Sequence, residues 1–285
     1  MAVFNSWGDK FVRVHVDMAN GTRYTFSDFA IRVKVDKKGS PDLPEAEVSI
    51  KGLSLETMEQ LTSLTFLKNT RQNNILVIEA GYTEGTIAQI FKGEISKATA
   101  DFNNAPEVEF TLNAKSGSFP SVIPQSPISV QGQQPAAEII EQLAKQIGYN
   151  VETNGITTSI SNTYIQGSPI QKIKNIANAI NADMLIDDNT IVILPRDKAR
   201  KNSFTPVLSA ENGLIGYPTL TDDGIQVVCF FNPGVQIGAC IKIDTIVPKA
   251  KGTWKVTEVN HELEVNSSQS AMWRTGFSAV YVSEL

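Results

Sequence analysis

The chain has 285 residues, of which 41% are hydrophobic, and its formal net charge is −5. A chain of this length can bury a substantial core in two or three domains. Its net negative charge argues against a protein that binds nucleic acid, because such proteins show a basic patch. No apolar run reaches the roughly 18 residues of a membrane span and the N-terminus lacks the pattern of a secretion signal, so we expect a protein that folds in a cytoplasm.

The first 115 residues show the two-residue periodicity of β-strands. Six strands are expected, at residues 12–18, 31–35, 46–50, 75–82, 87–96 and 107–114. A short helix interrupts them, with Ser54 as its N-cap and with Leu55, Met58 and Leu61 on one apolar face. An antiparallel sheet of this size normally closes into a barrel or packs as a sandwich, because both arrangements hide its edges.

The middle of the chain changes its pattern. Residues 116–134 are rich in Ser, Pro, Gly and Gln and are predicted to form a linker. Two helices with a 3.6-residue period follow, the first from Pro135 to Gly148 and the second capped by Ser168. A hairpin is expected over 184–194, turning at Asp188 and Asn189, and together these elements predict a small α+β insert domain over residues 135–203.

The β pattern returns from residue 204 to the end. A weak internal echo between residues 75–114 and 237–283 suggests two copies of one barrel. The predicted fold class is therefore mainly β, with two antiparallel, tube-like β-barrel domains at residues 1–115 and 204–285 flanking the small α+β domain.

Catalytic motifs are missing from the sequence. It contains no phosphate-binding loop, no dinucleotide-binding fingerprint, no nucleophile elbow and no C-x-x-C. The only two histidines, His15 and His261, are both expected on the solvent side of a strand, and the His261–Glu262 pair lacks the second histidine of the zinc motif. Cys229 and Cys240 are expected to be buried small hydrophobic side chains.

Two pairs of adjacent aspartates are the best candidates for carboxylate chemistry. Asp187–Asp188 and Asp222–Asp223 could ligate a hard cation or act as acid and base. Each pair sits at a turn signal, however, where aspartate side chains bond backbone amides. The acidic segment 36–45 lacks the spacing of a calcium loop and is expected to be an exposed β-loop. We therefore expect no catalytic, cofactor-binding or metal-binding residue.

Four stretches carry a resemblance to a known family. They are AEVSIKGLSLETMEQL (46–61), ILVIEAGYTEGTIAQIFKGEISKA (75–98), GLIGYPTLTDDGIQVVCFFNPGVQIGACIKI (213–243) and WKVTEVNHELE (254–264). In this order they resemble the baseplate hub proteins of contractile-tailed bacteriophages and their relatives in phage-like secretion machines. Each stretch is a strand-and-turn pattern, and together they span nearly the whole chain.

The resemblance implies a structural protein of the virion tail baseplate, assembled in the host bacterial cytoplasm, and not an enzyme. It implies a homotrimer whose subunits each contribute two tube-like barrels, giving a pseudo-six-fold ring that joins the tail tube to the central spike. The implied partners are the spike protein and the tube or tube-initiator proteins. DNA would pass through the channel without specific binding, and no cofactor or membrane span is implied.

Two other functions remain open from the residues alone. A ligand-binding or carbohydrate-binding β-protein would need a cluster of exposed aromatic side chains, but Trp7, Trp254 and Trp273 are scattered through the chain. A hydrolase would need one of the aspartate pairs as its acid and base.

Overall fold

The computed structural model describes residues 8–39, 42–62, 74–103, 105–118, 120–121, 125–200, 204–267 and 272–281. Trp7 lies outside these residues. The N-terminal β region contains β1 (Lys10–Asp17), β2 (Arg23–Phe26), β3 (Ala30–Lys38), β4 (Glu45–Lys51), α1 (Leu55–Leu61), β5 (Ile75–Tyr82), β6 (Ile87–Asp101) and β7 (Glu109–Lys115). The alternation of buried and exposed side chains along β1, β3 and β4 is the one that the sequence predicts.

The insert and the C-terminal β region supply the other elements. The insert contains β8 (Ile128–Ser129), β9 (Gln133–Pro135), α2 (Ala136–Gln146), β10 (Asn150–Glu152), β11 (Ser159–Ser161), β12 (Tyr164–Ile165), α3 (Pro169–Ala179), β13 (Ala182–Asp187) and β14 (Thr190–Pro195). The C-terminal β region contains β15 (Val207–Leu208), β16 (Leu214–Leu220), β17 (Ile225–Phe230), β18 (Cys240–Ile243), β19 (Gly252–Val265) and β20 (Trp273–Tyr281). The prediction of a mainly β fold is confirmed.

One sheet runs through both β regions. Its hydrogen-bonded order is β16-β17-β20-β19-β3-β4-β7-β6-β5-β1-β2, with β18 paired to β19 and β15 paired to β18. The two regions are joined where β19 pairs antiparallel with β3, from Glu258 opposite Lys38 to Val265 opposite Ile31. The path stays open between β16 and β2, so the described strands form no closed barrel. The two regions share one sheet through β3 and β19, so the predicted arrangement of two separate barrels is not confirmed.

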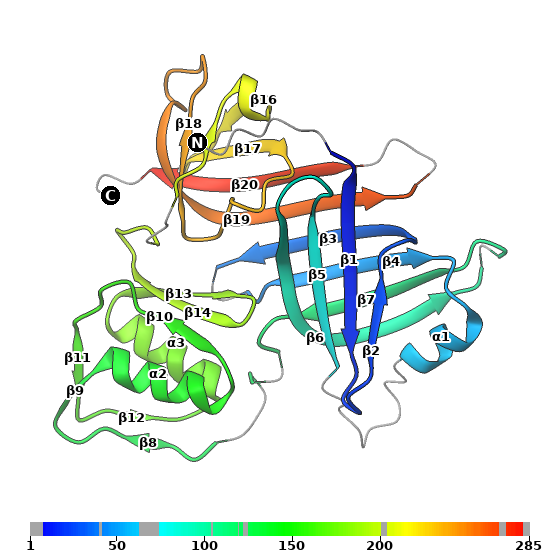
Figure 1. Cartoon of the computed structure of the whole chain (residues 1–285). Coiled ribbons are helices and arrows are strands. Elements are labelled where there is room, and N and C mark those ends of the chain that lie inside the picture. The colour runs from blue at the N-terminus through cyan, green and yellow to red at the C-terminus, as the bar shows by residue number, and fades with distance from the viewer. Residues whose placement is uncertain are drawn as a thin grey trace.

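The sheet folds over itself to enclose the first core. In Figure 1, β1 and β5 cross in front of β3, β4 and β7, and the valines of β1 pack in one buried cluster with the inward side chains of the other strands. Trp273 of β20 joins this cluster from the C-terminal region. A second β core lies under β16 to β20 and includes Val227, Ile241 and Val259.

The two helices of the insert pack on one hairpin. Ile139, Ile140 and Ile173 of the helices share a buried cluster with Ile186 and Ile193 of the hairpin. Since both helical stripes need an apolar partner, this hairpin supplies the layer that buries them. The hairpin turns at the predicted position, between Asp187 and Thr190.

The starts of the two helices follow different rules. Ser168 caps α3 through a complete capping box with Gln171, as expected for the second helix. Pro135 is instead the residue before α2 and belongs to β9.

The predicted linker 116–134 contains β8 and most of β9, which pair with β12 and β11. Strands of two or three residues are too short to show a two-residue period, so the sequence pattern did not reveal them.

No helix among the described residues is long and apolar enough to cross a membrane.

Candidate functional site

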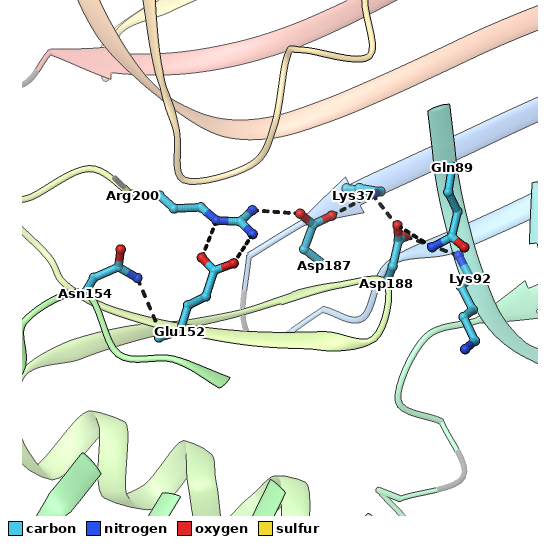
Figure 2. A network of polar contacts seen from close by, with 8 residues as sticks. All are labelled: Lys37, Gln89, Lys92, Glu152, Asn154, Asp187, Asp188 and Arg200. Carbon is cyan, nitrogen blue, oxygen red and sulfur yellow. Dashed lines mark hydrogen bonds and ion pairs between the residues drawn. The ribbon is translucent and has the colours of Figure 1, made fainter. Parts of the chain in front are cut away.

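A network of charged side chains lies where the insert hairpin meets the sheet (Figure 2). Lys37 comes from the end of β3, and Asp187 and Asp188 come from the turn between β13 and β14. Arg200 follows β14 along the chain. Side chains far apart in the sequence therefore meet at a single hairpin turn.

Lys37 is a buried cation held by both aspartates. Its Nζ donates to Asp187 Oδ1 at 2.7 Å and to Asp188 Oδ1 at 3.2 Å. Burial disfavours the charged form of Lys37, but the two carboxylates outweigh it and raise the lysine pKa above its usual value. The ammonium group thus stays charged inside the protein because it has two anionic partners.

Arg200 binds the other side of Asp187. Its Nη1 donates to Asp187 Oδ2 at 2.7 Å, while Nε and Nη2 form a two-pronged contact with Glu152 at 2.7 and 2.8 Å. The backbone of Arg200 also donates to the carbonyl of Gly238 at 2.7 Å, in the C-terminal β region. One arginine therefore connects β10, the hairpin and the second β region.

Asp188 connects the same turn to β6. Its Oδ2 accepts a hydrogen bond from Gln89 Nε2 at 3.1 Å, and its Oδ1 accepts one from the backbone N–H of Lys92 at 3.2 Å. Its backbone is left-handed, with φ of 55°, a conformation that aspartate tolerates in tight turns. The pair Asp187–Asp188 lies at a turn, as the sequence predicts, and both side chains also reach across to the sheet.

The network has little capacity for acid–base chemistry. Burial favours the neutral form of Asp187, but Lys37 and Arg200 overcome it and lower the pKa of Asp187 to about 2. A carboxylate held this firmly in its ionised form is a poor proton acceptor near neutral pH. Its geometry is that of a structural clamp between the insert and the sheet.

A second contact joins the insert to β19. Lys255 is buried, and its Nζ donates to the carbonyl of Arg196 at 3.2 Å and lies 3.4 Å from Asp183 Oδ2. A cavity of about 290 Å³ beside it is lined by both the hairpin and β19, including Met184 and Val256. The insert is therefore attached to each β region by a buried cation.

His261 is buried, and its expected position on the sheet surface is wrong. Its Nδ1 lies 2.9 Å from Thr275 Oγ1, and its ring meets the edge of Phe231 at a centroid distance of 5.4 Å. Val259 and Leu263 of β19 are buried. His261 lies two residues from each, so its side chain points to the same face of the sheet. Burial and the nearby Lys37 lower the pKa of His261 to about 3, so this imidazole is neutral.

The neutral His261 should make the protein less stable in mild acid. From about pH 6.5 down to about pH 3, the unfolded chain binds a proton at this position that the folded chain does not. The free energy of unfolding should therefore fall as the pH drops through this window, by up to about 1.4 kcal/mol per pH unit. In a His261→Gln variant the slope should be shallower by one proton, as urea unfolding at several pH values would measure. Equal slopes for both proteins would contradict the assignment.

The other sequence candidates do not meet at one site. His15 lies on the face of β1 opposite the buried valines, as expected. It is partly buried there, with its Nδ1 2.9 Å from Thr25 Oγ1. Asp222 and Asp223 are exposed at the turn between β16 and β17. Cys229 and Cys240 are buried, as predicted. Among the described residues, no group of three or more His, Cys, Asp or Glu side chains is arranged to hold a metal ion.

Comparison with known proteins gives one family and several similar folds. Residues 11–276 match the family model described as "Baseplate hub gp41". No curated protein matches the sequence. The tail protein from Neisseria meningitidis MC58 is 12% identical, with a TM-score of 0.64 over 96% of this chain and 97% of its own.

Two further solved structures have the same fold. The 43 kDa tail protein of prophage MuSo2 from Shewanella oneidensis is 8% identical, with a TM-score of 0.62 over 94% of this chain and 98% of its own. The E. coli c3393 protein, described as a type VI secretion component with structural similarity to T4 tail proteins, is 9% identical. Its TM-score is 0.59 over 94% of this chain and 77% of its own.

Proposed function

The chain belongs to the baseplate hub gp41 family, and from this premise we propose that three copies form a pseudo-six-fold ring that joins the tail tube to the central spike. Membership of this family is the observation that carries the proposal. Each subunit contributes two tube-like β domains, residues 1–115 and 204–285, and the α+β domain at 135–203 lies outside the ring. The ring sits in the virion baseplate after assembly in the host cytoplasm.

The shared sheet supports the proposal that the two β domains act as one unit. Because β3 and β19 are hydrogen-bonded over eight residue pairs, the two β regions are held in a fixed relation. Three such subunits present six similar faces to a six-fold tube while keeping three-fold symmetry for the spike. Ring closure then follows from one heterologous contact repeated by rotation.

The network of charged side chains between the insert and the sheet supports the proposal that the subunit is rigid. Lys37 and Arg200 hold the hairpin of the α+β domain against the sheet through Asp187 and Asp188. A hub that transmits force between a tube and a spike needs domains that do not move against each other.

A surface with balanced charge suits a channel that lets DNA pass. One side of the shared sheet carries acids and bases that pair with each other: Arg32 with the buried Glu264, Lys34 with Asp36, Lys115 with Glu45, and Arg274 with Glu262. Basic side chains already paired with carboxylates have little left to offer phosphate groups, so DNA would not be held.

We further propose that the protein has no catalytic centre. The double substitution Asp222→Asn and Asp223→Asn removes the exposed carboxylate pair, and we expect no loss of any hydrolytic activity of the tail. The free energy of unfolding should change by about 0.5 kcal/mol or less, as for other exposed sites. A peptidoglycan or glycan hydrolysis assay on wild-type and variant tails tests this. A hydrolytic activity that disappears in a folded double variant would overturn it.

The oligomeric state is the first test of the ring. The molar mass of the chain should be measured by light scattering alone and then with a candidate spike protein. We expect complexes that contain three copies of the chain, with the spike as a template where the chain alone stays monomeric. A complex with two or six copies per spike would contradict the proposal.

A further inference from the structure

The cavity beside Lys255 carries more positive than negative charge. Its walls come from the insert and from the C-terminal β region, and its volume is about 290 Å³. Its charged lining residues are Lys174 of α3, Asp183 of β13, Arg196 after β14, and Lys255 of β19. Three cations therefore share the cavity with one carboxylate, which leaves two positive charges in surplus among the lining side chains.

The single carboxylate, Asp183, is divided between two of these cations. Its Oδ2 lies 3.4 Å from Lys255 Nζ, and its Oδ1 lies 3.5 Å from Arg196 Nε. Both distances exceed the roughly 2.7–2.9 Å of a charge-assisted hydrogen bond. Lys174 has neither a carboxylate nor a hydrogen-bond partner among the described residues. The cavity therefore contains cations whose charge the protein itself compensates only in part.

The neighbouring network at the hairpin turn has the opposite balance. It joins two cations to three carboxylates. Its members are Lys37 and Arg200, with Asp187, Asp188 and Glu152. Both sets of contacts attach the insert to the β regions, but only the network at the turn is complete in its own side chains. The cavity lacks a counter-charge that a bound anion would supply.

The other lining groups suit a compact ligand. Asn178 lies one helical turn after Lys174 on α3, and its side-chain amide can donate to an anion. Met184, Val256 and Val280 add apolar wall. Ligand pockets usually measure about 300–1,000 Å³, so this cavity has room for a small molecule only. A nucleic-acid strand would instead need a basic groove that follows its backbone.

We propose that this cavity binds a small anion with two or more negative charges, such as a phosphate monoester or a polycarboxylate. The two lysines supply point charges, and Arg196 supplies a planar fork of donors. The bound anion contacts α3 and the segment after β14 on one side and β19 on the other, so it fastens the insert to the C-terminal β region. Binding requires a single subunit and is independent of the copy number of the chain in the tail.

Isothermal titration calorimetry of the purified chain tests this proposal. The probes are inorganic phosphate and citrate, with acetate as the singly charged reference, all at constant ionic strength. We expect phosphate or citrate to bind at one site per chain and acetate to bind more weakly. Lys174→Met should weaken the binding by about 10-fold or more, because a hydrogen bond to a charged group is lost. The matched control Lys145→Met lies on α2, exposed and outside the cavity, and should bind as the wild type does.

The melting temperature gives a second readout. Without an added anion, Lys174→Met should be at least as stable as the wild type, because it removes repulsion between like charges. Citrate at about ten times its dissociation constant should raise the melting temperature of the wild type by roughly 2–4 °C and that of Lys174→Met by much less. Phosphate and citrate also stabilise proteins through exclusion from their surfaces. An equal gain in the wild type and both variants would be this general effect and would overturn the proposal.

The remaining outcomes are also decisive. No saturable binding of either phosphate or citrate, or unchanged binding by Lys174→Met, would refute the site. If Lys174→Met fails to fold, Arg196→Gln provides the same test, since 56% of the Arg196 side chain is exposed and its replacement leaves the buried Lys255 in place.

Discussion

An Asp187→Ala variant should lose about 3 kcal/mol or more of its free energy of unfolding, because the substitution leaves the buried Lys37 and the partly buried Arg200 short of an anion. Lys37 and Arg200 both bind Asp187, and each keeps one further carboxylate, Asp188 or Glu152. The loss is therefore expected near the lower end of the range for broken buried pairs. Urea unfolding at pH 7 gives the value.

The pH dependence of this effect follows from the lowered pKa of Asp187. A carboxyl group with a pKa of about 2 in the folded protein and an ordinary value in the unfolded chain contributes its full stabilisation above about pH 4. That contribution is lost as the pH falls toward 2. The difference between wild type and variant should therefore be constant from pH 5 to 7 and shrink in stronger acid.

Two control variants make the Asp187 result interpretable. Asp222→Ala removes an exposed aspartate from another hairpin turn and should change the free energy of unfolding by about 0.5 kcal/mol or less. The double variant Lys37→Met with Asp187→Leu removes one charge of each sign and should recover much of the loss. If Asp187→Ala costs no more than Asp222→Ala, the charge network does not hold the insert to the sheet.

A Gly93→Ala variant should destabilise the fold by about 2–3 kcal/mol. Gly93 is buried at the point where β6 leaves its pairing with β5 and begins its pairing with β7. A Cβ there would lie 2.8 Å from backbone atoms of Lys115 and Ser116, and a backbone cannot move aside as a side chain can. The melting temperature should fall by roughly 4–12 °C.

Gly276 provides the matched control for Gly93. It also lies in a long strand of the same sheet, but a Cβ at this position would meet nothing closer than 4.0 Å. A Gly276→Ala variant should therefore be as stable as the wild type or slightly more stable. Equal melting temperatures for the two variants, by scanning calorimetry, would mean that the close approach at Gly93 does not determine the fold.

Local patterns predicted the elements well because their causes are local. The alternation of valines and charged residues in 12–18 fixes a strand whatever it pairs with, and Ser168 followed by Pro169 fixes the start of a helix. The pairing of β3 with β19 connects residues more than 200 positions apart. No local pattern encodes such a partner, so the shared sheet could not be read from the sequence.

The charged network could be predicted only in part. The expectation of an exposed loop over residues 36–45 is wrong at its start, because β3 continues to Lys38 and Lys37 is buried in phase with Ile31, Val33 and Val35. Extending the alternation of 31–35 by two residues would have indicated a buried lysine in need of anions. His261 gave the same kind of signal on β19. Arg200 lies beyond the end of β14, where the chain has no period, and its contacts with Glu152 and Asp187 follow from the tertiary fold alone.

The central claim is that this chain forms a ring of three copies on the axis of the tail. A reconstruction of the assembled particle by electron cryomicroscopy, without imposed symmetry, tests it most directly. We expect three copies around the channel, each placing both of its β regions next to it, between a six-fold tube and a three-fold spike. Six copies in the ring, or a position of the chain away from the axis, would contradict the account.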